Sequence, residues 1–148
     1  MKKMFTLKGV SNCGKSSKVK ETAEWVMNNY PHHQNINNSI NLTKGDIRGV
    51  LQVNNLKIAF NSAGDDLDCV LGNDDLLNLY PDIDILVNTC RTKGATRIHL
   101  DKNFNYSTGW LVKKIYVNKF NPSNQPQEQA RDLLILDELK AWLTGLEK

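Results

Sequence analysis

The pattern of hydrophobic and polar positions divides the 148-residue chain into alternating strand-like and helix-like segments. Short β-branched and apolar runs predict strands, and apolar positions at helical spacing predict helices. The predicted strands are residues 4–7, 46–53, 56–60, 83–87 and 110–120; the predicted helices are residues 15–29, 67–79 and 127–146. Residues 95–106 fit either a short helix or an irregular loop, and the asparagine-rich residues 32–41 are predicted to be loop. This alternation predicts an α/β fold with a mostly parallel sheet covered on both faces.

Two details refine that pattern. Asn54 and Asn55 alone separate two predicted strands, and asparagine tolerates positive φ, so we expect an antiparallel hairpin within the otherwise parallel sheet. The last predicted helix has a broad apolar face. Its members are Ala130, Leu133, Leu134, Leu136, Leu139, Trp142, Leu143 and Leu146.

Composition narrows the class of protein. With 40% hydrophobic and 24% charged residues, the chain is neither a disordered protein nor a disulfide scaffold. Its length suits a single domain over residues 1–148. The three cysteines have irregular spacing and are expected to be reduced thiols. There is no apolar run near the roughly 20 residues of a membrane span, and no long apolar signal region, so we expect a cytoplasmic protein without a membrane partner.

Charge is unevenly distributed, although the net charge is only +3. Residues 1–20 hold six lysines and no acid, and residues 65–84 hold seven aspartates and no base. Residues 91–119 hold seven basic residues and one acid, Asp101. Two basic segments could therefore meet at one anionic ligand.

One motif carries specific chemistry: residues 9–16 read GVSNCGKS and fit G-x-x-x-x-G-K-[ST] at every fixed position. The glycines allow successive backbone N–H groups to turn inward around an anion, and the next helix adds its free N-terminal amides. Lys15 can reach the β- and γ-phosphates of a nucleotide, and the Ser16 hydroxyl can coordinate Mg²⁺. The predicted nucleotide-binding residues are Gly9, Ser11, Asn12, Cys13, Gly14, Lys15, Ser16 and Ser17.

With an apolar strand just before it and a helical pattern just after it, this motif resembles that of the P-loop NTPase superfamily. The resemblance covers the first strand, the loop and the first helix. It implies a three-layer P-loop domain, with ATP or another nucleoside triphosphate and Mg²⁺ as its ligands.

Proteins of that superfamily usually carry an acid after a second strand, and two alignments supply different candidates. In one, residues 61–64 (NSAG) take the place of the Asp-x-x-Gly motif of GTPases, so the neutral amide of Asn61 replaces the acid. In the other, which we prefer, Asp65 is the acid that holds Mg²⁺, and Asp66 could share this role. Either aspartate could instead cap the following helix. The guanine-reading Asn-Lys-x-Asp motif is absent from the sequence.

Further candidates lie beyond other strands. Arg91 and Lys93 follow the predicted strand 83–87, at the edge where α/β sheets bind ligands, so Arg91 is predicted to contact phosphate or developing charge. Asp46 could orient an accepting hydroxyl, although a turn or cap role is the preferred interpretation. Lys113 and Lys114 indicate a protected edge strand rather than a nucleic-acid surface.

These observations give two hypotheses of function. The first is an ATP-binding P-loop protein, either a Mg²⁺-dependent ATPase or a small kinase-like phosphotransferase, with Lys15, Asp65 and Arg91 as catalytic residues. The second is a nucleotide-dependent switch with weak or no hydrolysis, which the GTPase-like alignment of Asn61 favours. Either protein would bind a nucleoside triphosphate together with a small-molecule acceptor or a protein partner.

Overall fold

The computed structural model describes residues 1–10, 13–43, 45–120 and 122–143, except for the side chain of residue 142. The strands of these ranges form one sheet in the order β2-β3-β4-β5-β1-β6. They are β1 (Lys2–Lys8), β2 (Gln34–Asn35), β3 (Arg48–Val53), β4 (Leu56–Asn61), β5 (Ile85–Cys90) and β6 (Trp110–Tyr116). β4, β5, β1 and β6 are mutually parallel, whereas β2 and β3 run antiparallel to their neighbours.

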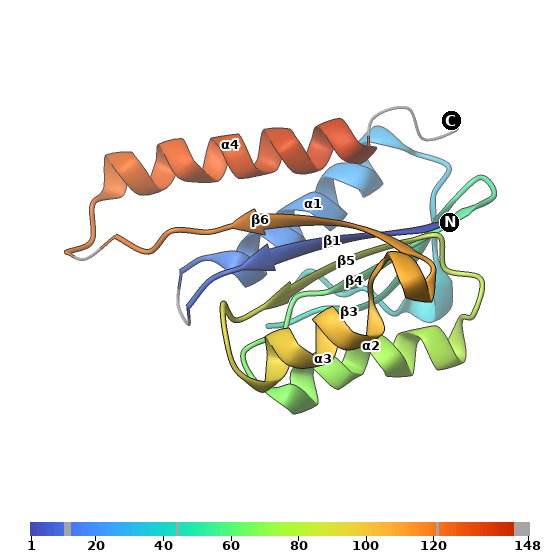
Figure 1. Ribbon diagram of the computed structural model, residues 1–148. Coiled ribbons are helices and arrows are strands. Elements are labelled where there is room, and N and C mark those ends of the chain that lie inside the picture. The colour runs from blue at the N-terminus through green and yellow to red at the C-terminus, as the bar shows by residue number, and fades with distance from the viewer. Residues whose placement is uncertain (11–12, 44, 121, 144–148) are drawn as a thin grey trace.

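Helices cover both faces of the sheet and make three layers (Figure 1). They are α1 (Lys15–Asn29), α2 (Leu67–Leu79), α3 (Ala95–Asn103) and α4 (Gln125–Leu143), with short 3₁₀ turns at Ile36–Asn38 and Tyr106–Thr108. α1 and α4 pack on one face over a core that includes Phe5, Leu7 and Phe60. α2 and α3 pack on the other face over a core that includes Met4 and Leu86. Within the described ranges, every helix is too short or too polar to cross a membrane.

The predicted α/β class is confirmed, and so are the mostly parallel sheet and the antiparallel hairpin. The hairpin joins β3 to β4 through a turn in which Asn54 has φ = 51°. The undecided segment after residue 94 is the helix α3. The prediction that residues 32–41 are loop is wrong at two short elements, because Gln34 and Asn35 pair with β3 and Ile36–Asn38 form a 3₁₀ turn. β6 lies at the edge of the sheet, as its adjacent lysines indicated.

The bounds predicted for the fourth strand, residues 83–87, are wrong. The strand β5 begins at Ile85 and ends at Cys90. Ile83 belongs to the turn after α2, where its N–H donates to the Tyr80 carbonyl. The polar end of β5 is buried because it pairs with β1, and Thr6 Oγ1 donates to Asn88 Oδ1 at 2.7 Å. A buried side-chain hydrogen bond lets polar residues continue a central strand.

The apolar face predicted for the last helix is wrong in part. Leu133 and Leu134 are 63% and 71% exposed, and Ala130 is exposed as well. The buried residues of α4 are Ile135, Leu139 and Leu143, because residues four apart lie on one side of a helix. Two other predicted members, the Trp142 side chain and Leu146, lie outside the described residues.

Candidate functional site

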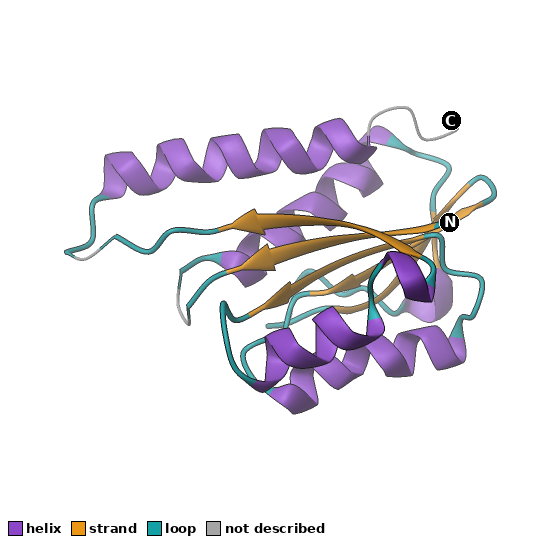
Figure 2. Cartoon of the chain, in the orientation of Figure 1, coloured by secondary structure: helices purple, strands orange, loops and turns teal. Residues whose placement is uncertain are grey.

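Three loops leave the sheet at the same edge, because β1, β4 and β5 are parallel and their carboxyl ends lie together (Figure 2). They comprise residues 9–14, which we call the glycine loop, residues 62–66 and residues 91–94. Crevices at the carboxyl edge of a parallel sheet are the usual ligand sites of α/β proteins.

The glycine loop leads directly into α1. Gly14 is the N-cap residue and has φ = +97°, a conformation that favours glycine. Lys15 begins the helix and is 4% exposed, and its Nζ donates to the carbonyl oxygens of Gly9 at 2.7 Å and Val10 at 2.8 Å. The ammonium group therefore contacts the start of the glycine loop, and Lys15 is the first residue of a 15-residue helix whose N-terminal amides have no partners within the helix. Such amides and a nearby cation together attract an anion.

Asp65 joins this arrangement from the second loop. Its Oδ1 is 3.1 Å from Lys15 Nζ. Gly64 makes the contact possible, because the loop crosses β5 so closely that a Cβ on Gly64 would collide with the carbonyl oxygen of Thr89. Asp65, which the sequence favoured as the acid, therefore forms an ion pair with the lysine of the motif.

Asp66 caps a helix, which is the second of the two roles, metal binding and helix capping, that the sequence left open. It is the N-cap of α2, and its Oδ1 accepts the Cys69 N–H at 2.8 Å. This backbone hydrogen bond lowers the pKa of the Asp66 carboxyl. The two adjacent aspartates therefore divide the roles, with Asp66 at the helix cap and Asp65 at Lys15.

Ser16 anchors α1 to the loop after β4. Its Oγ donates to the Ser62 carbonyl at 2.8 Å, and Thr89 Oγ1 donates to the same oxygen at 3.1 Å. The Ser62 hydroxyl donates in turn to Asp46 Oδ1 at 2.8 Å. A chain of hydrogen bonds therefore connects Ser16 to a second carboxylate, that of Asp46. The sequence pattern gave no signal for Ser62 or Thr89, because their roles depend on the order of strands in the sheet.

Asn61, the alternative to Asp65, lies at the end of β4 and is fully buried. Its Nδ2 donates to the Cys69 carbonyl at 3.0 Å and to Asn73 Oδ1 at 3.1 Å, both in α2. The Asn61 amide therefore binds the α2 side of the sheet, and Asp65 alone of the two candidates contacts Lys15.

Arg91 and Lys93 line the same hollow as Asp65. This hollow has a volume of about 460 Å³ and is also lined by Val10 of the glycine loop and Thr96 of α3. The loop that carries Arg91 is held to α3, because the Arg91 N–H donates to Thr96 Oγ1 at 3.2 Å. The structure thus brings the acid of one loop and the two cations of another to one cavity beside the glycine loop.

The other residues predicted to bind nucleotide are Ser11, Asn12, Cys13 and Ser17. Ser11 and Asn12 lie outside the described residues. Cys13 is buried, with its Sγ against Gly9. Ser17 Oγ donates to the Gly14 carbonyl at 2.9 Å in the first turn of α1. Both described side chains therefore support the conformation of the loop.

Two buried titratable groups lie beneath the loop, on the α3 face of the sheet. Burial lowers the pKa of Lys8, which is 3.8 Å from Asp101. Burial also raises the pKa of the Cys90 thiol from 9.0 to about 11. Cys90 is therefore a neutral thiol at physiological pH, which makes it a poor nucleophile.

We expect native protein at pH 8.5 to resist alkylation at Cys90, and partly exposed Cys69 to react faster, as peptide mass spectrometry after iodoacetamide treatment would measure. Because the pKa of Cys90 is higher in the folded state, its contribution to stability is complete below pH 9.0 and is lost as the pH rises towards 11. Equal labelling rates for the two thiols in native protein would contradict this burial.

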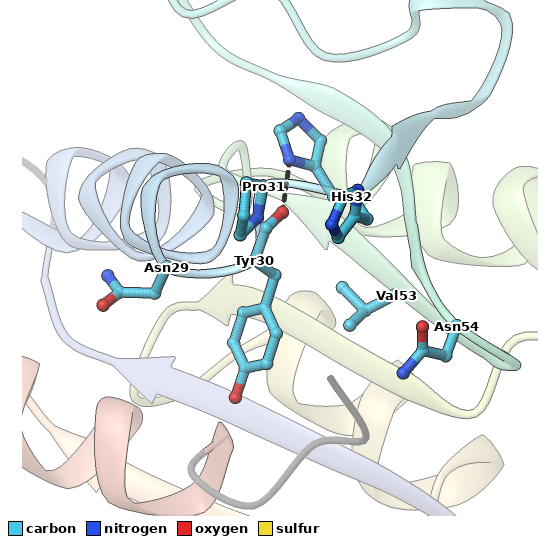
Figure 3. Close-up of a pocket in the computed structure, with 7 residues that line it drawn as sticks. Asn29, Tyr30, Pro31, His32, Val53 and Asn54 are labelled. Atoms are coloured by element: carbon cyan, nitrogen blue, oxygen red, sulfur yellow. Dashed lines mark hydrogen bonds between the residues drawn. The ribbon is translucent and has the colours of Figure 1, made fainter.

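A second hollow lies near the opposite end of α1, between Tyr30, Pro31 and His32 and the hairpin residues Val53 and Asn54 (Figure 3). Its volume is about 40 Å³, which is far below the roughly 300–1,000 Å³ of typical ligand pockets. His33, which also lines it, has its Nδ1 atom 2.7 Å from the Tyr30 carbonyl oxygen. We therefore assign the candidate site to the carboxyl edge of the sheet.

The fold and this edge define a mostly parallel α/β protein whose candidate site combines a helix N-terminus, a buried lysine, carboxylates and exposed cations. Among the described residues, no three histidine, cysteine, aspartate or glutamate side chains cluster as a metal-binding group. Comparisons with protein-family models, curated proteins and solved structures find no match. The function is therefore inferred from the site itself.

Proposed function

We propose that the chain is a P-loop NTPase domain that binds ATP, or another nucleoside triphosphate, through residues 9–17. The observation that carries this proposal is the contact of Lys15 Nζ with the glycine loop and with Asp65, at the N-terminus of α1. A buried ammonium beside free helix amides is suited to an anion of high charge density. The motif of residues 9–16 specifies the same chemistry independently.

Mg²⁺ fits this proposal through Ser16 and Asp65. Magnesium in nucleotide sites usually keeps several waters and takes only one or two carboxylates, so a preformed cluster of three acids is not required. When bound, the ion would neutralise charge on the phosphates. Ser16 and Asp65 would hold it, and Asp46 could accept a hydrogen bond from a water in its hydration shell, since it is linked to Ser16 through Ser62.

The reaction that we propose is transfer of the terminal phosphoryl group, either to a small acceptor or to water. Arg91 and Lys93 line the hollow next to Asp65, where positive charge would orient an anionic acceptor and stabilise charge that develops on the phosphoryl oxygens. A hollow of about 460 Å³ is large enough for a small metabolite. These features favour an ATPase or a small phosphotransferase.

Thermal unfolding with ATP, GTP and their diphosphates, each with and without Mg²⁺, tests the binding step. A ligand at one hundred times its Kd is expected to stabilise the native state by about 2.7 kcal/mol, because it binds only the folded protein. The Lys15→Ala variant is expected to lose most of this stabilisation, since it lacks the buried ammonium.

Lys57→Ala is the matched control, because Lys57 pairs with Asp82 at 2.6 Å in the hairpin region and should respond to nucleotide like the wild type. If no nucleotide stabilises the wild-type protein, the proposed function is wrong. Once binding is established, phosphate release with and without candidate acceptors distinguishes an ATPase from a phosphotransferase.

A further inference from the structure

An arginine from the last helix lies against the glycine loop. The Arg131 Nη2 atom would be 3.3 Å from a Cβ on Gly14, the residue that caps α1. Its side chain is only 13% exposed, although it is cationic and belongs to a surface helix. No sequence motif indicates this position, because 116 residues separate the two segments and only the packing of α4 beside α1 brings them together.

Neighbouring groups hold the guanidinium in one orientation. Arg131 Nε and Nη2 donate to Asp132 Oδ1 at 3.0 and 2.9 Å, and Nη1 donates to the Asn118 carbonyl. The guanidinium carbon also lies 5.8 Å from the centre of the Phe120 ring. Two of its five N–H groups have no partner among the described residues, so the cation is fixed in place yet can still donate.

The same acid links Arg131 to the helix that follows the loop. Asp132 Oδ2 is 3.2 Å from Lys18 Nζ, which also contacts Ser17 Oγ at 3.3 Å. Lys18 is buried in the first turns of α1. This network ties the position of the Arg131 guanidinium to the N-terminal end of α1, so the two cannot shift independently without breaking partly buried charge pairs.

The order of strands fixes which end of a bound phosphate chain faces Arg131. Asp65 follows β4, which lies beyond β5 on one side of β1, whereas Asn118 and Arg131 follow β6 on the other side of β1. If the terminal phosphate points towards Asp65 and Arg91, the α-phosphate lies on the side of Gly14 and Arg131. Arginine donates charge-assisted hydrogen bonds to phosphate oxygens, and its fixed orientation lowers the entropy cost of that contact.

We propose that Arg131 is a second phosphate-binding cation. It contacts the α-phosphate of the bound nucleotide, at the opposite end of the triphosphate from the Mg²⁺ site. This inference rests on the proposed function, since it requires the nucleotide to bind at the glycine loop. It assigns the last helix a part in ligand binding, in addition to its part in the core.

The role of Arg131 is tested by titration calorimetry with ATP, ADP and AMP. The proteins compared are wild type, Arg131→Ala, Arg131→Gln and Lys15→Ala. Loss of a charge-assisted bond is expected to weaken binding of all three nucleotides by the same factor of about ten to one hundred in both Arg131 variants. Lys15→Ala is expected to weaken ATP most and AMP least, because Lys15 serves the β- and γ-phosphates. Unequal losses in the Arg131 variants, largest for ATP, would contradict a contact with the α-phosphate, which all three nucleotides share.

Lys113→Ala is the control for loosening of α4. Lys113 lies on the strand β6, and its Nζ pairs with Glu138 of α4 at 3.0 Å. It should leave all three affinities unchanged. Wild-type affinity in Arg131→Ala, or an equal loss in Lys113→Ala, would overturn the role of Arg131 while leaving the proposed function intact. Absence of binding to wild type would overturn both.

Discussion

Gly64→Ala is expected to destabilise the protein by about 3 kcal/mol, at the upper end of the range for overpacking. The added methyl group would collide with the backbone of β5 at Thr89, and backbone in the centre of a sheet cannot move aside like a flexible side chain. The loop must therefore lift away from β5, which would also displace Asp65 from Lys15. Urea unfolding followed by circular dichroism measures the change in the free energy of unfolding.

Gly45→Ala is the matched control for this prediction, because no atom lies within 4 Å of a Cβ added there. Its free energy of unfolding should change by less than about 0.5 kcal/mol or increase slightly, since alanine restricts the unfolded chain more than glycine does. Equal stability of Gly64→Ala and wild type would show that the close contact between the 62–66 loop and β5 does not exist in solution.

Under the proposed function, Asp65→Asn is expected to lower nucleotide turnover by a factor of about one hundred or more, since it removes charge that holds the metal at the transferring phosphate. Stability should change little, because the Asp65 side chain is 52% exposed and a half-exposed ion pair contributes about 1 kcal/mol at most. Steady-state phosphate release at several Mg²⁺ concentrations measures the effect.

The neighbouring substitution Asp66→Asn removes the same charge one residue along the chain. Asparagine caps helices about as well as aspartate, so α2 should keep its N-cap and the protein its stability. We expect turnover close to that of the wild type. A larger loss in Asp66→Asn than in Asp65→Asn would reverse the assignment of the two aspartates.

Local patterns predicted most of the helices and strands because each element carries its own periodicity and end signals. The start of α1 follows from Gly14 and the motif, and the hairpin turn follows from its asparagines. The end of β5 could not be predicted in the same way. Two of its last three residues, Asn88 and Thr89, are polar, and they are buried because they pair with β1 in the middle of the sheet.

In the candidate site, too, some residues could be identified from the local sequence, whereas the roles of others depend on contacts between distant segments. The motif identified Lys15 and Ser16, and the position of Asp65 after β4 made it a candidate. The sequence could not assign separate roles to Asp65 and Asp66, since this depends on which carboxylate reaches the first turn of α2. Arg131 gave no local signal at all, because its relation to Gly14 exists only when α4 packs beside α1.

The buried hydrogen bond between Thr6 and Asn88 has a consequence for how the chain assembles its site. β1 and β5 could in principle pair in several registers, since each has several buried apolar side chains that do not distinguish one register from the next. A slip by one residue would leave both polar groups without partners in the interior, at a cost of about 1–3 kcal/mol for each. Misaligned pairing is therefore disfavoured, and the loops after β1 and β5 emerge at one level. The hydroxyl of Thr6 and the amide of Asn88, both within strands, therefore help to set the relative positions of the two loops that follow.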